Sequence, residues 1–287
     1  MLLDFPVVQY SGGLLPWLIA IWVADSWRLA LWTLGVGLDL LLIWVFSGDK
    51  ILARFQAKQA ARDAARSGSR SSVRPRRRGP QVHVMSVDPA LLSERLGLFV
   101  IIVLGESVVQ VVDAAASASY SLGLLATGVA SFVLLAGLFG LSVVFGYAGL
   151  PHLRAGRIST RVALGLHALV TAVIATLAVS LSAVIVHGSD PLPGGSRWLL
   201  CGAAATYFAL GVVTGVVSHS SDLQRTVSRV TTGIAVPLLL GLLGTDLAGR
   251  TLVICLAVLV LAHLWFERRL PPVRGRVGSE IPQPRTT

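Results

Sequence analysis

The chain has 287 residues, of which 54% are hydrophobic and only 13% are charged, whereas a soluble domain carries about a quarter charged residues. This composition excludes an ordinary soluble domain and predicts an all-α, polytopic integral membrane protein. The formal net charge is +10, and ten basic and two acidic residues between Asp49 and Pro80 supply +8 of it. The positive charge therefore belongs mostly to one segment.

Apolar runs predict seven transmembrane helices, preceded by one short element. The short element, Leu14–Ala24, contains Pro16 and is shorter than the roughly 20 residues that a span needs. It is either a half-helix or one end of a longer helix. The seven predicted spans are Leu29–Phe46, Leu96–Val112, Leu122–Leu150, Val162–Val186, Trp198–Val217, Val230–Leu243 and Thr251–Phe266.

These runs divide the chain into four parts. Residues 1–48 hold the N-terminal membrane helices, and residues 49–93 form a basic cytoplasmic linker. Residues 94–266 form a six-helix membrane region, and the polar, Pro/Arg-rich tail at 267–287 is expected to be disordered. The partner of the membrane parts is the lipid bilayer.

The basic linker carries Arg54, Lys58, Arg62 and Arg66 at four-residue intervals, which predicts a helix with a basic face. Near a cytoplasmic leaflet, each Lys or Arg contributes roughly 1 kcal/mol of attraction to anionic lipid. We therefore expect residues 49–80 to contact anionic headgroups. Nucleic acid is not an expected partner, because the segment has no interleaved aromatic residues and no nucleic-acid-binding motif.

Successive predicted loops alternate between many and few Lys and Arg residues. Cytoplasmic loops of membrane proteins carry the excess of these residues, so the alternation indicates which loops are inside. With the linker inside, the segments 151–161, 218–229 and the tail are also inside and carry three, two and five of these residues. The loops 113–121, 187–197 and 244–250 are outside and carry none, one and one. The pattern predicts a cytoplasmic C-terminus.

The sequence contains few signals of enzymatic chemistry. Cys201 and Cys255 lie in apolar runs, so they suggest small packing residues rather than a disulfide or metal site. No Walker A, HExxH, CxxC or G-x-S-x-G motif occurs. We expect no catalytic residues, no cofactor and no bound metal.

Glu106 is the first candidate functional residue, because it lies inside an apolar run, about ten residues from its start. At ~1.5 Å per residue it would lie near the middle of a ~30 Å hydrocarbon core, where a charge is costly. Gln110 and Asp113 follow at i+4 and i+7 on the same helix face. Two roles stay open: a carboxylate that couples ion or proton movement, and one that hydrogen-bonds two helices together.

Three further residues complete a predicted ion or substrate pathway with Glu106 and Gln110. Ser107 would supply a hydroxyl, Asp39 a second intramembrane acid, and His167 a proton relay, since its ordinary pKa is near neutral. For each of them, helix packing is the alternative role.

Glu94 and Arg95 precede this run at the cytoplasmic membrane edge and form a predicted charge pair, or else anchor the helix at the interface. Gly211 and Gly215 form a GxxxG pattern, which indicates close helix packing within the chain or between subunits of an oligomer. Pro237 interrupts a short span, which either kinks it or lines a binding site.

The run Glu94–Ser107, ERLGLFVIIVLGES, resembles the signature of the bacterial low temperature requirement A (LtrA) family, roughly H-x-x-E-R-x-G-L-F-x-I-I-x-L-G-E-[SA]. Weaker similarities are the Leu-His pair at His167 and Glu267 at the end of the last span. The resemblance covers about Leu29–Glu267 and implies a multi-pass protein of the bacterial inner membrane. It implies no reaction or substrate.

Three departures from the family pattern stand out. Leu91 occupies the position of the family histidine, and Val144–Tyr147 lacks the acid of an aromatic-aromatic-acidic element. The family's N-terminal block, with an E-L-F-F-D-L-V-F-like motif, has no counterpart. The chain is therefore expected to be a shorter member, a late-called start, a split gene or a decayed copy.

The sequence leaves two hypotheses for function. The first is a secondary transporter or channel that uses Glu106, with an unknown substrate. The second is a membrane scaffold or an envelope stress-adaptation protein, in which the intramembrane acids are structural; an inactive truncated copy is a variant of this alternative.

Overall fold

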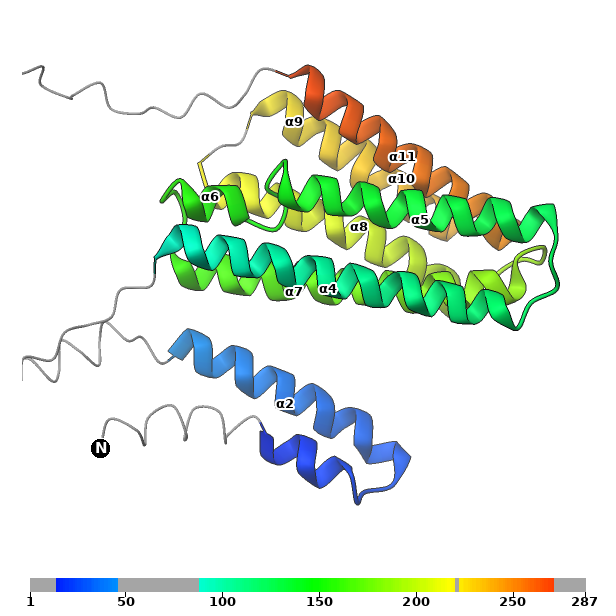
Figure 1. Ribbon diagram of the computed structural model, residues 1–287, viewed down its shortest axis with the longest axis horizontal. Coiled ribbons are helices and arrows are strands. Elements are labelled where there is room, and N and C mark those ends of the chain that lie inside the picture. Colours follow the sequence, from blue (N-terminus) through cyan, green and yellow to red (C-terminus); the bar gives the residue numbers. More distant parts are fainter. Residues whose placement is uncertain (1–13, 46–87, 220–221, 271–287) are drawn as a thin grey trace, which may run out of the picture. The chain divides into compact units, whose positions relative to one another are not determined.

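The computed structural model describes residues 14–45, 88–219 and 222–270, in two compact units, 1–85 and 86–287 (Figure 1). The regular elements in these ranges are all helices, with one isolated β-bridge between Pro191 and Ala248. The expected all-α class is confirmed. The basic linker up to residue 87 and the C-terminal tail beyond residue 270 lie outside the described residues. Residues 89–93, expected to belong to the linker, form the start of α4, and residues 267–269, expected to belong to the tail, are the last residues of α11.

The described part of the first unit is a pair of helical segments. Residues 14–20 are helical and include Pro16, and α2 (Asp25–Val45) follows after a turn. The rings of Trp17 and Trp32 stack with centroids 6.0 Å apart, which packs the two segments together. The short N-terminal element thus ends before Ala24.

Six helices in the described ranges are long and apolar enough to cross a membrane, which is one fewer than the seven expected. The expected span Leu29–Phe46 corresponds to α2, which is not among the six. The six are α4 (Pro89–Ala116), α5 (Leu122–Val143), α7 (Thr160–His187), α8 (Gly194–Val217), the helix Leu223–Leu243 and α11 (Gly249–Arg269). All six belong to the second unit, and the architecture is that of a multi-pass membrane protein.

The starts of three helices follow directly from the sequence. The side chains of Asp88, Ser121 and Ser159 accept hydrogen bonds from the first-turn N–H groups of α4, α5 and α7. Such N-caps satisfy backbone donors that have no partner within the helix.

The expected span Leu122–Leu150 ends early, at Val143. Gly146 and Gly149 adopt φ angles of +80° and +77°, which side-chain-bearing residues rarely adopt, so the chain leaves the helix here. Tyr147, between the two glycines, is turned into the core with 1% of its surface exposed. The short helix α6 (Leu150–Arg154) follows.

The second unit is a helix bundle in which α7 packs against both α4 and α8, and α11 packs against α5 (Figure 1). In a bilayer there is little hydrophobic force between helices, so close van der Waals contact holds them together. Gly137 of α5 shows this closeness, because a Cβ added there would overlap with Val260 of α11.

The helix Leu223–Leu243 is continuous but irregular. It consists of α9 (Leu223–Ser228), the π-helical segment η1 (Arg229–Ile234) and α10 (Ala235–Leu243). The N–H of Ala235 bonds to the carbonyl of Val230, five residues back. Pro237 has no N–H to donate, and its ring crowds the preceding turn, so widening that turn relieves the clash. The interruption expected at Pro237 is therefore realised one turn before it.

Candidate functional site

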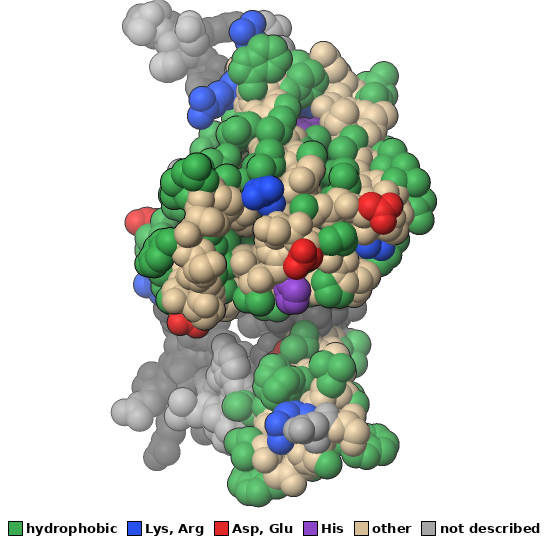
Figure 2. Space-filling model, turned by 90° about the vertical axis from the view of Figure 1, so that its right-hand side faces the viewer, with side chains coloured by type: hydrophobic (Ala, Val, Ile, Leu, Met, Phe, Trp, Pro, Cys, Tyr) green, Lys and Arg blue, Asp and Glu red, His purple; other side chains and the backbone are tan. Residues whose placement is uncertain are grey.

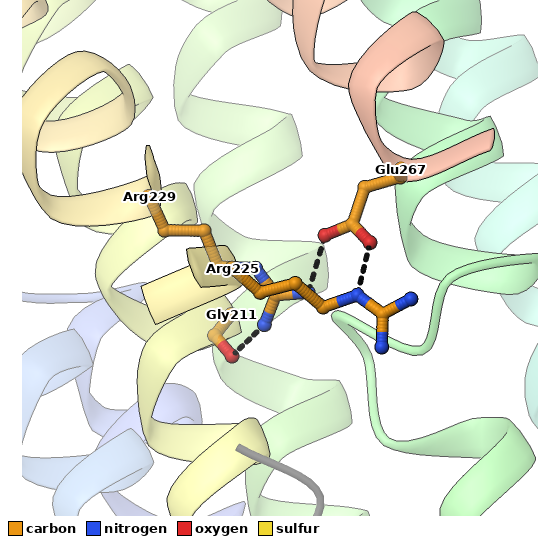
Figure 3. A network of polar contacts seen from close by, with 4 residues as sticks. All are labelled: Gly211, Arg225, Arg229 and Glu267. Carbon is orange, nitrogen blue, oxygen red and sulfur yellow. Dashed lines mark hydrogen bonds and ion pairs between the residues drawn. The ribbon is translucent and has the colours of Figure 1, made fainter. Parts of the chain in front are cut away.

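Two arginines of the irregular helix pair with one carboxylate of α11 in a buried network (Figure 3). Glu267 Oε2 accepts a hydrogen bond from Arg225 Nε at 3.0 Å, and Oε1 accepts one from Arg229 Nη2 at 2.6 Å. Arg229 Nη1 donates to the carbonyl oxygen of Gly211 at 2.8 Å. The exposed fractions of Arg225, Arg229 and Glu267 are 9%, 9% and 4%. Charges this deeply buried are tolerated only when they are paired and hydrogen-bonded.

The local sequence places both arginines of the network on one face of the irregular helix. Arg225 and Arg229 are four residues apart, so both face the same side of the helix. Arg229 is also the first residue of η1, and π-helical turns frequently occur at functional sites.

The aromatic ring of Tyr147 packs against the guanidinium group of Arg229. The Arg229 Cζ lies 4.3 Å from the centre of the Tyr147 ring, a cation–π contact. The Tyr147 ring stacks on Tyr207 with centroids 5.5 Å apart, and Thr214 Oγ1 donates to the Tyr147 carbonyl at 3.1 Å. Burial raises the pKa of Tyr147, so its hydroxyl stays neutral and adds no counter-charge.

Gly211 makes this arrangement possible. A Cβ at this position would overlap with the Tyr147 ring. Gly211 and Gly215 are both buried, so the close packing expected from their GxxxG pattern is formed within the chain. An oligomer through these glycines remains a prediction.

A pocket of about 410 Å³ opens beside the network. Among the residues that the structure describes, its charged lining consists of three arginines and two carboxylates, a formal net charge of +1: Arg225, Arg229, Arg268, Asp222 and Glu267. The uncharged lining includes Gly146, Thr214 and Thr226. No group of three or more His, Cys, Asp or Glu side chains within the described ranges is placed to hold a metal ion.

His152 also lines the pocket, and its environment makes it neutral. Burial, followed by the positive charges of Arg157 and Arg229, lowers the pKa of His152 below its ordinary value of 6.5. The unfolded chain therefore protonates His152 more readily than the folded protein does. As a result, the contribution of neutral His152 to the free energy of unfolding is fully present above about pH 6.5 and is lost as the pH drops toward the folded-state pKa.

We predict that acidification from pH 7.5 to 5.5 lowers the melting temperature less in His152→Gln than in the wild type. The replacement removes the one proton that the unfolded chain takes up preferentially at this position. Thermal unfolding in detergent at several pH values measures the difference. Equal losses in the two proteins would show that His152 does not contribute.

Glu106 lies elsewhere, on the outward face of α4. Glu106, Phe99 and Ile102 are all exposed, the last two by 48% and 67%. Glu106 Oε1 accepts a long hydrogen bond of 3.4 Å from Gln110 Nε2 on the same helix. The predicted polar face therefore exists, and it faces away from the core of the second unit.

The remaining predicted pathway residues are not gathered at one place within the second unit. His167 is buried on α7, with its ring centroid 5.7 Å from that of Phe99. Neither of its ring nitrogens has a hydrogen-bond partner among the described residues. Ser107 is buried and donates to the carbonyl of Val103 in its own helix at 2.7 Å. Asp39 belongs to the first unit and is exposed there.

Glu94 and Arg95 occupy adjacent, exposed positions in the second turn of α4. Neighbouring residues of a helix do not face each other, so their side chains diverge.

Sequence reasoning overlooked the buried network. It counted Arg225 and Arg229 only as topology signals, and it noted Glu267 only as a weak family similarity. Their i, i+4 spacing next to a proline-interrupted span and a glutamate ending the last span were the available signals. Nothing in the sequence shows that the two helix ends meet.

Comparison with known proteins adds one finding. The family model described as bacterial low temperature requirement A protein (LtrA) matches residues 2–261. This match begins before Leu29, where the resemblance was expected to start. No curated protein and no solved structure matches the chain.

Proposed function

The chain belongs to the bacterial low temperature requirement A family, and we propose that this multi-pass membrane protein is a secondary transporter or channel rather than an enzyme. The proposed solute site is the pocket beside Arg225, Arg229 and Glu267. The residues around it come mainly from the segment after α5 and from α6, α8, α9, η1 and α11, so helix movements on several sides would reshape it.

The observation that carries this proposal is the irregular helix Leu223–Leu243 with two buried arginines. Charged residues inside membrane helices are rare and tend to mark solute or ion pathways. Helices interrupted by Gly or Pro also tend to line the binding sites of transporters. Here one interrupted helix supplies both features, and both adjoin a pocket of about 410 Å³.

We further propose that the protein lies in the bacterial inner membrane with this pocket and the C-terminus on the cytoplasmic side. The pocket end of the second unit carries most of the arginines, including Arg157, Arg161, Arg268 and Arg269. The opposite end, which Figure 2 faces, shows few charged side chains among hydrophobic and neutral ones. The positive-inside rule supports this orientation.

Flux measurements in proteoliposomes test the transport proposal. We expect protein-dependent flux of at least one solute from a panel of protons, Na⁺, K⁺, chloride, phosphate and sulfate. Arg229→Lys should reduce that flux by about tenfold, because lysine keeps the charge but loses the fork of donors that bridges Glu267 and Gly211. Arg269→Lys is the matched control, since Arg269 is exposed and stacks on Trp265. Vesicles without flux for any of these solutes would contradict the proposal.

A membrane scaffold remains the second candidate, and the exposed face of α4 favours it. A carboxylate and an amide in an apolar helix are costly against lipid, so a protein partner on this face would stabilise them. In the flux assay, Glu106→Gln separates the two roles. A folded variant with lost or uncoupled flux assigns Glu106 to transport, whereas unchanged flux leaves it a docking or packing residue.

A further inference from the structure

The pocket beside the network holds more positive than negative charge. Of the five charged side chains that the described part of the chain contributes to its lining, three are arginines, and Asp222, one of the two carboxylates, is exposed. Tyr147 and His152 do not alter this balance, because their pKa shifts keep both neutral near pH 7. Glu267 alone is shared by two buried arginines.

Arg229 also has a donor left over. Its Nη1 and Nη2 groups bond to Gly211 and Glu267, but its Nε is buried and has no partner among the described residues. The residue is nine-tenths buried and lines the pocket. Buried donors nearly always have an acceptor, so this one has room for an acceptor, such as a ligand or water oxygen, that the described residues do not supply.

From this geometry we infer that the pocket binds a small oxyanion, a phosphate or carboxylate group, on the face of Arg229 next to Arg225 and Arg268. The inference names the substrate class of the site proposed above and rests on that proposed function. Guanidinium groups match the spacing of two oxygens on one phosphate or carboxylate. A pocket of about 410 Å³ accommodates such a group together with several waters.

Glu267 then competes with the oxyanion for the donor groups of Arg225 and Arg229. Its carboxylate already occupies Arg225 Nε and Arg229 Nη2, in the manner of a bound carboxylate ligand. It also places a negative charge next to the arriving anion. Removal of this charge should therefore strengthen anion binding even though it weakens the resting network.

The first test is equilibrium binding of inorganic phosphate to the full chain in uncharged detergent, by calorimetry at constant ionic strength. Glu267→Gln should bind about tenfold tighter than the wild type, the effect of one neighbouring charge at ~4–6 Å. Glu94→Gln, which removes an exposed carboxylate from α4, should leave the affinity unchanged.

A second pair of variants uses exposed positions that the fold tolerates. Arg268→Gln removes an exposed charge from the pocket lining and should weaken binding several-fold. Arg269→Gln removes the neighbouring exposed charge, which does not line the pocket, and should have no effect.

Nanodiscs separate the two sources of the same chemistry, a free anion and a lipid headgroup. With a free anion, phosphate raises the melting temperature in phosphatidylcholine discs. With a headgroup, phosphatidylglycerol discs raise it without added phosphate. In either case the gain should be larger for Glu267→Gln than for Glu94→Gln, and smaller for Arg268→Gln than for Arg269→Gln.

The inference is overturned if neither source stabilises the protein, or if Glu267→Gln and Glu94→Gln respond alike. It is also separable from the transport proposal. Phosphate binding with this variant pattern but without flux would support the anion site and contradict the transport proposal. Flux without such binding would support transport and contradict the anion site.

Discussion

Glu267→Ala is expected to lower the free energy of unfolding by about 3–5 kcal/mol, the cost of breaking a buried ion pair by removing one partner. The carboxylate is the acceptor that Arg225 and Arg229 share, at 3.0 and 2.6 Å. Without it, two guanidinium groups stay buried side by side with no opposite charge between them. Unfolding in mixed micelles with increasing SDS, followed by tryptophan fluorescence, measures the loss.

The control for this prediction is Glu94→Ala, which changes the net charge by the same amount on an exposed helix face. Exposed substitutions of this kind change stability by about 0.5 kcal/mol or less. If the two variants lose similar stability, the buried network does not hold α11 to the irregular helix.

Gly211→Ala is expected to destabilise the protein by about 1–3 kcal/mol, the usual cost of overpacking a well-filled core. Its new methyl group would overlap with the Tyr147 ring, and that ring cannot move freely because it is only 1% exposed and stacks on Tyr207. A displaced Tyr147 would also leave Arg229, whose cation–π contact it supplies. The same micelle unfolding measures this effect.

Gly202→Ala tests the same replacement on the same helix, α8, at a place where an added Cβ meets no neighbouring atom within 4 Å. Alanine favours a helix interior over glycine by up to about 1 kcal/mol. Gly202→Ala should therefore be neutral or stabilising. Equal destabilisation at both positions would mean that α8 tolerates no side chain at either glycine, and that the Tyr147 contact is not special.

The membrane class of the protein was predictable from local sequence, because a bilayer imposes a strict length and polarity on each span. Each of the six long helices in the described ranges overlaps a predicted apolar run by more than half of its length. Errors arose where backbone chemistry interrupts a run. Gly146 and Gly149, for example, end α5 before Leu150. The predicted count of spans was a separate error, because α2 is not among the six.

The candidate site was predictable only in part. The prediction centred on Glu106, because a charge inside an apolar run is costly, and the structure places Glu106 on the exposed face of α4. The deeply buried charges are Arg225, Arg229 and Glu267, all near the ends of their helices. Position along a span shows how deep a residue lies, but not whether it faces lipid or protein.

The sequence by itself determined the all-α membrane class, the approximate positions of the long helices and the family, since each depends on residues close together in the chain. Only the tertiary structure decided that Glu267 meets Arg225 and Arg229, and that Tyr147 lies beneath Arg229. The physical reason is that burial and pairing are properties of contacts between distant segments. Side-chain packing between helices sets those contacts, and hydropathy does not record it.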